Sequence, residues 1–314
     1  MRHLPYVSSA VRSGMVASLL AFGVLLVWLP QQNARAAASL RDITLGVLCS
    51  SNLFHSVNPP DLIAAGKVWL TDMGLRRGFR VDLVLEVSGR MEEIRRRAAD
   101  PKVGVVMLDT TEYLRIASPN LRPVFTLTAG RNRIGQKYQL VVRRDSEWTR
   151  VQQLQGKRIN IYSRTEGGLG AMWLEVQLDD LHLGRIQTFF GSVTTVVKPS
   201  AACLPVFFNK ADACVIDDAS MQVLEELNPQ LASKLQVLEI SPVFVEGVIA
   251  LNGTWPYQNE FVQGLAELDR DPSGKQVLTL FKGDHAEPLT NVDLNSVREL
   301  WASYQRLTRK AESK

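Results

Sequence analysis

Strand-like and helix-like segments alternate along most of the chain, and this predicts an α/β protein built on mainly parallel sheets. Short uncharged apolar runs, such as Val103–Leu108 and Ala213–Ile216, have the length and composition of buried strands. Segments whose apolar residues recur at helical spacing, such as Asp61–Met73, lie between such runs. The chain is long enough for two lobes of this kind, each with its own sheet.

The first half shows this alternation most clearly. Phe79–Val87 alternates apolar and polar residues, as expected of a half-buried strand, and Ser88 can cap the helix that follows it. The elements expected here are, in chain order, a strand at Ile43–Leu48, a helix at Asp61–Met73, a strand at Phe79–Val87, a helix at Arg90–Ala99, a strand at Val103–Leu108, a helix at Glu112–Ala117, and strands at Val124–Thr128 and Tyr138–Arg143.

A second unit is expected to begin near Ser146 and to repeat the alternation. Its elements are expected to be, in order, a strand at Ile159–Ile161, a helix from the glycine-rich turn Ser163–Gly170 through Leu181, strands at Thr188–Phe190 and Ala213–Ile216, a helix at Asp217–Leu227, strands at Leu235–Ile240 and Gly247–Leu251, and helices at Asn259–Leu268, Asp271–Phe281 and Asn291–Thr308.

The first 36 residues have the composition of a secretory signal peptide. Arg2 and Arg12 precede the uncharged run Met15–Leu29, and Ala34-Arg35-Ala36 forms a small-x-small cleavage site. The run is shorter than the roughly 20 residues that span a bilayer, so an uncleaved anchor is the less favoured alternative. The protein is therefore expected to act outside the cytoplasm.

Charge and composition argue against a nucleic-acid partner. The leader holds three of the 36 basic residues and no acidic one, so 33 basic residues face 32 acidic ones in the mature chain, a net charge of +1. The basic run Arg95–Arg97 is interpreted as a solvated helix face. The four histidines show no metal-ligand spacing, and no metal site is predicted.

Three cysteines leave at least one thiol unpaired in an exported protein. Cys49, Cys203 and Cys214 are best interpreted as small buried side chains. A Cys203–Cys214 disulfide and a thiol site for a soft metal or arsenite remain as alternatives.

Polar residues gather directly after the predicted strands, where open α/β sheets bind ligands. These residues include Ser50, Asp109, Thr110, Lys198, Ser200, Asp217 and Glu246. The segment SRTEGGLG (Ser163–Gly170) is the strongest local signal, because a glycine-rich helix start offers free N–H groups to an anion. An ordinary helix cap by Ser163 or Thr165 explains the same pattern.

No catalytic motif is present in the sequence. A G-x-S-x-G elbow and a P-loop are absent, and Trp173 occupies the third glycine position of a dinucleotide fingerprint. The adjacent Asp217 and Asp218 would point in different directions on a helix. We therefore predict neither catalytic residues nor a cofactor.

Four segments resemble the periplasmic solute-binding proteins of phosphate, phosphite and phosphonate ABC transporters. LQGKRINI resembles the turn before the family's second lobe, and SRTEGGLG is placed like its anion loop. FFNKADACVIDDA (Phe207–Ala219) resembles a family strand and turn, and Leu278–Trp301 resembles its closing segment. The order and spacing of the four are more specific than any one of them.

The resemblance implies a type II periplasmic binding protein, in which two α/β lobes joined by two crossing strands close on a ligand. Lobe 1 would comprise residues 41–143 and 242–314, and lobe 2 residues 144–241. The ligand-binding residues that the resemblance implies, besides Ser50, are Asp109, Thr110, Tyr113, Ser163, Thr165, Glu166, Gly167, Lys198, Ser200, Asp217 and Glu246.

The function implied is capture of a small, oxyanionic, phosphate- or phosphonate-like ligand for a membrane ABC permease. A monomer without catalytic activity is expected. The alternatives are a sensory binding protein that partners a membrane histidine kinase, with arsenite or another oxyanion as ligand, and a periplasmic enzyme on the same fold.

The leader makes a direct prediction about processing. Because the apolar run ends before Ala34-Arg35-Ala36, the exported protein should begin at Ala37 or within a few residues of it. N-terminal sequencing of the mature protein measures this. A mature pool that begins at Met1 would instead indicate an anchored protein.

Overall fold

The computed structural model describes residues 40–53, 58–130, 132–165 and 168–312. The predicted leader, residues 1–36, lies outside the described residues, as do Glu166 and Gly167 of the predicted anion loop. Residues Ser39–Lys314 form one compact unit, and everything below concerns that unit. No helix within the described ranges has both the length and the apolar character that crossing a bilayer requires.

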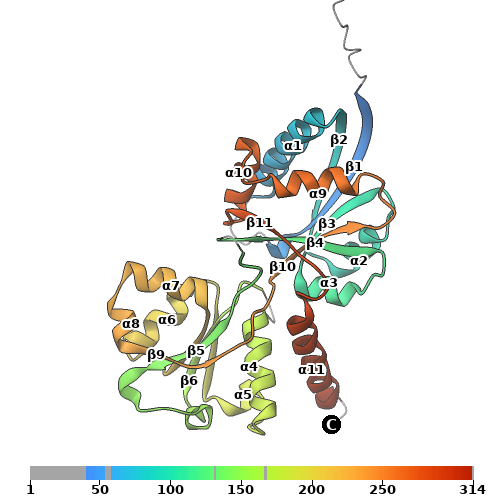
Figure 1. Cartoon of the computed structure of the whole chain (residues 1–314). Helices are drawn as coiled ribbons and strands as arrows, with labels where there is room; N and C mark the ends of the chain where they lie inside the picture. The colour runs from blue at the N-terminus through green and yellow to red at the C-terminus, as the bar shows by residue number, and fades with distance from the viewer. Residues whose placement is uncertain (1–39, 54–57, 131, 166–167, 313–314) are drawn as a thin grey trace, which may run out of the picture. The chain divides into compact units, whose positions relative to one another are not determined.

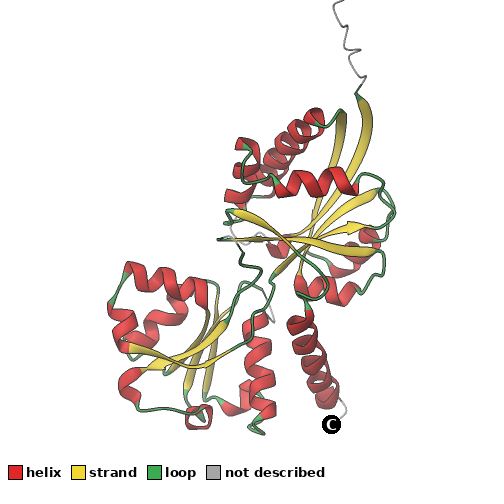
Figure 2. Cartoon of the chain, viewed as in Figure 1, coloured by secondary structure: helices red, strands yellow, loops and turns green. Residues whose placement is uncertain are grey.

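Two sheets flanked by helices make up this unit, which confirms the predicted two-lobed α/β fold class (Figures 1 and 2). The six-stranded sheet has the order β11-β4-β10-β3-β1-β2. Its strands are β1 (Arg41–Ser50), β2 (Phe79–Ser88), β3 (Val103–Asp109), β4 (Leu121–Thr128), β10 (Gly247–Asn252) and β11 (His285–Pro288). The five-stranded sheet has the order β7-β6-β8-β5-β9. Its strands are β5 (Tyr138–Arg143), β6 (Arg158–Tyr162), β7 (Ser192–Val196), β8 (Ala213–Asp217) and β9 (Leu235–Ile240).

Both sheets combine parallel and antiparallel pairs. β1 pairs parallel with β2 and β3, and β6 pairs parallel with β7 and β8. The strands that follow the crossings between the sheets run the other way, since β10 is antiparallel to β3 and β5 is antiparallel to β8. The start of β5 and the start of β10 therefore lie at the same edges as the carboxyl ends of β8 and β3.

Helices cover both faces of each sheet, because successive strand residues point to opposite faces. In β3, Val105 packs in the cluster with α1, α9 and α10, whereas the next residue, Val106, packs with α2 and α3. In β5, Leu140 packs with α4 and α5, whereas Val141 packs with α6, α7 and α8. The helices are α1 (Pro59–Arg76), α2 (Met91–Ala98), α3 (Thr110–Ile116), α4 (Leu169–Asp180), α5 (Ile186–Phe189), α6 (Pro199–Phe207), α7 (Asp218–Leu227), α8 (Gln230–Lys234), α9 (Gln258–Ala266), α10 (Pro272–Leu280) and α11 (Asn295–Glu312).

The chain crosses between the sheets twice, after β4 and after β9. The two crossing segments pair with each other at an antiparallel bridge in which the amides of Gln136 and Phe244 each donate to the other residue's carbonyl, at 2.9 and 2.8 Å. β5 lies in the five-stranded sheet, so the first crossing precedes Tyr138 instead of following Arg143, the expected boundary.

The C-terminal segment touches both halves of the unit. Leu289 and Leu294 belong to the hydrophobic cluster beside the six-stranded sheet. Val297 and Leu300, on α11, belong to the cluster of the five-stranded sheet, where α11 packs against α4. The expected assignment of the whole C-terminal segment to one lobe therefore differs from the packing.

Two local expectations were wrong. The predicted strand Thr188–Phe190 is instead the end of the short helix α5, and the strand β7 follows it. The helix forms because Ile186 and Phe189, three residues apart, are buried together on one turn. Arg90, not Ser88, is the N-cap residue of α2, and the Ser88 hydroxyl instead accepts from the Arg90 amide and donates to Glu93.

The bridge between the crossing segments makes a stability prediction at Gly135. A Cβ there would overlap the Phe244 carbonyl oxygen that accepts the Gln136 amide. Gly135→Ala should lower the free energy of unfolding by about 1–3 kcal/mol, because the backbone must shift to accept the added carbon. Denaturant unfolding monitored by circular dichroism measures this.

Gly253→Ala is the matched control, since its Cβ would meet nothing closer than the Asn120 oxygen at 3.4 Å. Equal unfolding midpoints for the two variants would show that the crossing segments are not held closely together.

Candidate ligand-binding site

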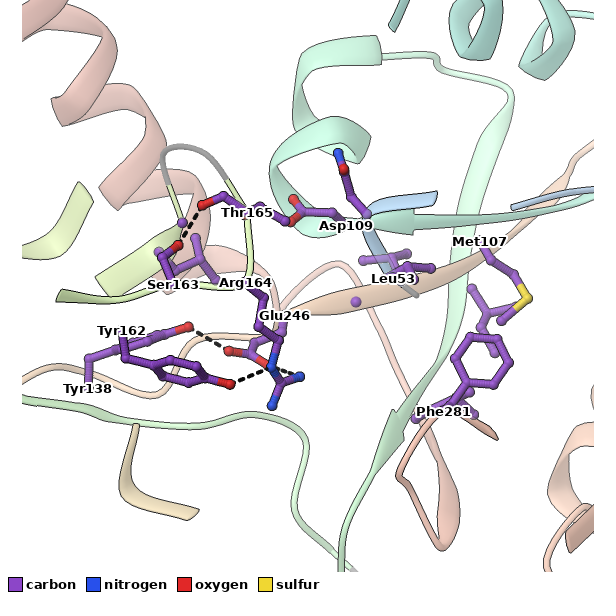
Figure 3. Close-up of a pocket in the computed structure, with 17 residues that line it drawn as sticks. Leu53, Met107, Asp109, Tyr138, Tyr162, Ser163, Arg164, Thr165, Glu246 and Phe281 are labelled. Carbon is purple, nitrogen blue, oxygen red and sulfur yellow. Dashed lines mark hydrogen bonds and ion pairs between the residues drawn. The ribbon is translucent and has the colours of Figure 1, made fainter. Parts of the chain in front are cut away.

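A cavity of about 130 Å³ lies where the two sheets face each other at their strand ends (Figure 3). The six-stranded side provides the ends of β3, β4 and β10 and the short turn η1 (Ser51–Leu53), and the five-stranded side provides Tyr138, Tyr162 and the start of α4. The described lining residues are Asn52, Leu53, Met107, Asp109, Leu127, Tyr138, Tyr162, Ser163, Arg164, Thr165, Gly168, Leu169, Glu246, Gly247, Val248, Ile249 and Phe281.

Arg164 is the one positively charged side chain among these described lining residues. It follows Ser163, just after the end of β6. Its Nε donates to the Tyr162 hydroxyl at 2.8 Å, while its guanidinium lies 3.7 Å from the Glu246 carboxylate. Burial disfavours the charged form, but Glu246, Tyr162 and Asp217 outweigh that effect, so the pKa of Arg164 lies above its ordinary value. The guanidinium is held in place and remains cationic.

Glu246 faces Arg164 from the second crossing segment. Its carboxylate accepts a hydrogen bond from the Tyr138 hydroxyl. Removal from water raises the pKa of Glu246, while Arg164 and the Tyr138 hydroxyl oppose the rise. Burial, together with the carboxylate beside it, also raises the pKa of Tyr138 well above its ordinary value, so the phenol stays a neutral donor.

A second network fixes Asp109 at the opposite wall. Asp109 caps α3, since one carboxylate oxygen accepts from the Thr111 amide at 2.6 Å, and the Glu112 carboxylate accepts from the Asp109 amide at 3.0 Å. The other Glu112 oxygen accepts from the Ser50 hydroxyl at 2.9 Å and from the Asn52 amide group at 2.8 Å. This buried carboxylate therefore ties the ends of β1 and β3 together and orients the cavity residues Asn52 and Asp109.

The segment before α4 approaches the cavity from the other side. Ser163 is buried and donates from its hydroxyl to the Thr165 carbonyl. The N-cap of α4 is Gly168, where a Cβ would overlap the Ser163 hydroxyl. Neither Ser163 nor Thr165 occupies the cap position, so the ordinary capping interpretation does not describe this loop.

The structure brings four of the predicted site residues to the cavity: Asp109, Ser163, Thr165 and Glu246. The other predicted site residues that the structure describes lie elsewhere, while Glu166 and Gly167 are outside the described residues. The Ser50 hydroxyl donates to the Glu112 carboxylate and does not reach the cavity. The Tyr113 hydroxyl donates to the Leu121 carbonyl inside the core. Lys198 and Ser200 stand at the start of α6, outside the cavity lining.

Two buried polar groups near the cavity keep unused hydrogen-bonding capacity. The Thr110 hydroxyl and one Asp217 carboxylate oxygen have no hydrogen-bond partner among the described residues. The other Asp217 oxygen caps α7 by accepting from the Ser220 amide at 2.7 Å. Both residues were predicted for the site, but neither lines the cavity: Thr110 follows the lining residue Asp109, and Asp217 pairs with the lining residue Tyr138.

The sequence analysis missed the aromatic and cationic members of the site. Tyr138 begins an antiparallel strand, so it reaches the edge that holds the carboxyl ends of the parallel strands, and a search of residues after strands overlooks it. Tyr162 and Arg164 lie in the segment Tyr162–Thr165, directly after the predicted strand Ile159–Ile161, but the resemblance implied only Ser163 and Thr165 of this segment.

The cysteines lie outside this site. Cys49, Cys203 and Cys214 are all buried free thiols, and no disulfide joins them. Burial raises the pKa of Cys49 to about 12, and its Sγ lies 3.6 Å from the Met107 sulfur. Among the described residues no group of three metal-ligating side chains is close enough to hold an ion.

Fold and site together define a type II periplasmic binding protein, with a cavity between two α/β halves. The model of a protein family described as "ABC transporter, phosphonate, periplasmic substrate-binding protein" matches residues 54–294. The chain therefore belongs to the family of periplasmic substrate-binding proteins of phosphonate ABC transporters. No curated protein matches the chain.

Solved structures share the fold at low sequence identity. XAC2383 from Xanthomonas citri, bound to chloride, is 13% identical with a TM-score of 0.61, over 86% of this chain and 99% of that one. PhnD1 from Prochlorococcus marinus, in complex with methylphosphonate, is 14% identical with a TM-score of 0.56, over 83% of this chain and 98% of that one.

The family assignment confirms the predicted function class. The protein is a solute-binding protein of the ABC transporter type, and its family is one of periplasmic substrate-binding proteins rather than enzymes. The predicted individual site residues are not tested by these similarities and stay predictions.

The raised pKa of Glu246 predicts how stability depends on pH. Because the folded protein holds the Glu246 proton more tightly than the unfolded chain, the contribution of Glu246 to stability falls as pH rises from the ordinary value near 4.5 through the raised pKa. Glu246→Gln, which keeps an acceptor for Tyr138, should therefore gain stability relative to wild type over that window. Urea unfolding at several pH values measures this.

The exposed Glu299 provides the control, since Glu299→Gln should leave the pH dependence unchanged. A Glu246→Gln variant whose stability parallels that of wild type at every pH would show that this carboxylate is not desolvated.

Proposed function

We propose that the mature protein, exported by the leader 1–36, captures a small organic anion of the alkylphosphonate type and delivers it as a monomer to a membrane ABC permease. The observation that carries this proposal is Arg164, a guanidinium held at the wall of a cavity that both sheets line. The family assignment supports the transport role.

The polar end of the cavity suits an oxyanion. The guanidinium offers a fork of N–H donors that matches phosphonate or carboxylate oxygens. The phenol groups of Tyr138 and Tyr162 and the Thr165 hydroxyl lie around it (Figure 3). The N-terminus of α4 also lines the cavity at Gly168 and Leu169 and adds a favourable dipole.

The acidic residues restrict the charge of the ligand. Glu246 and Asp109 line the same cavity as the single Arg164, so a fully ionised dianion would meet two carboxylates and one cation. A singly protonated phosphonate avoids this repulsion, because its P–O–H can donate to a carboxylate. PhnD1 of Prochlorococcus marinus was solved with methylphosphonate, an anion of this type.

Binding from both sides would couple ligand capture to closure. Arg164 and Tyr162 come from the five-stranded half, whereas Asp109 and Asn52 come from the six-stranded half. A ligand that contacts both favours the arrangement that brings them together, and its differential affinity sets how far that equilibrium shifts. A permease that recognises the closed arrangement would then distinguish the loaded protein from the empty one.

The test is calorimetric titration with methylphosphonate. A hydrogen bond to a charged group contributes about 1.5–3 kcal/mol, so Arg164→Gln should weaken binding about 10- to 150-fold. Arg158→Gln is the matched control, because Arg158 lies at the other end of β6 and pairs with Asp212.

The control variant should bind as the wild type does. Equal affinities of wild type and Arg164→Gln for methylphosphonate would show that Arg164 does not contribute to ligand binding. The absence of measurable binding by the wild type to phosphonate, sulfonate and carboxylate probes alike would contradict anion capture altogether.

A further inference from the structure

A second, smaller cavity of about 40 Å³ lies inside the six-stranded half. It lies between the sheet and helices α1, α9 and α10, and its walls expose carbon and sulfur atoms without any polar surface. Leu62 of α1 and Leu265 of α9, both buried, form part of its inner wall. Apolar cavities of this kind stay free of water and accept apolar guests.

The small cavity adjoins the ligand-binding cavity. Four side chains, Met107, Leu127, Ile249 and Phe281, line both. Met107 and Phe281 stand together at the end of the larger cavity away from Arg164 and the tyrosines (Figure 3). Methionine is unbranched and adaptable, so the boundary between the cavities can widen by a change of rotamer.

Polarity therefore changes along one continuous line of lining residues. It begins at Arg164, Glu246 and the tyrosines, passes Leu53 and Met107, and ends in the apolar inner cavity. We infer that the ligand is amphiphilic: an anionic headgroup at Arg164 that carries an unbranched alkyl tail, directed past Met107 and Phe281 into the inner cavity. This inference rests on the proposed function and names its substrate class.

The size of the inner cavity bounds the tail. A water-sized group needs about 10–15 Å³ of such volume, so 40 Å³ holds about three groups of methylene size. Each methylene group that leaves water for this cavity strengthens binding about fourfold. Three further methylenes, the difference between methyl and butyl, correspond to about a 60-fold gain.

The experiment is a calorimetric ligand series on the wild-type protein. Methyl-, propyl- and butylphosphonate should bind with rising affinity: propylphosphonate about 15-fold and butylphosphonate about 60-fold tighter than methylphosphonate. 3-Hydroxypropylphosphonate should lose the gain of the propyl compound, because its hydroxyl would have no partner in the apolar cavity. The same alkyl series with sulfonate headgroups repeats the measurement with another oxyanion.

Two variants place the tail in the structure. Leu62→Phe and Leu265→Phe each fill the inner cavity from a different helix without touching the headgroup site. Either should bind methylphosphonate as wild type does and lose the gain from longer tails. Leu227→Phe, at an exposed position, is the control and should keep the rising series.

The outcomes separate this inference from the proposed function. A flat or falling series, with methylphosphonate still bound, overturns the amphiphilic ligand and leaves anion capture intact. A rising series that survives in a folded filling variant overturns the inner cavity as the tail site. If neither filling variant folds, the hydroxypropyl comparison on the wild type decides. Binding by no member of either series contradicts the proposed function and removes this inference with it.

Discussion

The carboxylate of Glu246 has to be paired, and this requirement joins the two halves of the protein at the site. Its backbone carbonyl accepts the Thr110 amide at 2.9 Å at the end of β3, while its side chain accepts the Tyr138 hydroxyl at the start of β5 and lies 3.7 Å from Arg164. Its side chain is only partly exposed, and a carboxylate largely removed from water without such partners would be destabilising. Glu246, which lies in the second crossing segment, therefore fixes the hydrogen-bond donors of Tyr138 and Arg164 on the five-stranded side. On the six-stranded side it fixes the end of β3.

The fold could be predicted from the sequence because its signals are local. Continuous apolar runs mark the central strands β3 and β8, and the alternation in Phe79–Val87 marks the edge strand β2, whose side chains are only partly buried. The direction of β5 and β10 could not be read in this way. An antiparallel neighbour and a parallel one bury the same apolar residues, so the sequence pattern alone does not tell at which edge Tyr138 lies.

The site was only partly predictable, because its important contacts join residues far apart in the chain. Asp109 and Glu246 were found because each adjoins a strand, but the role of Glu112 depends on Ser50 and Asn52, about sixty residues away. Lys198 and Ser200 show the reverse case: they follow β7 and lie at the start of α6, yet the side chains that line the cavity come from elsewhere. Spacing locates strand ends, whereas tertiary packing decides which side chains reach the cavity.

The packing of the C-terminal segment has a mechanical consequence. Leu294 is anchored in the core of one half and Val297 in the core of the other, so a span of three residues, less than one helical turn, joins the two anchors. Any rotation of one sheet against the other has to be absorbed by backbone torsions within that span and in the two crossing segments. The span from Leu294 to Val297 is therefore a short link between the two halves. It permits them to bend relative to one another but opposes their separation.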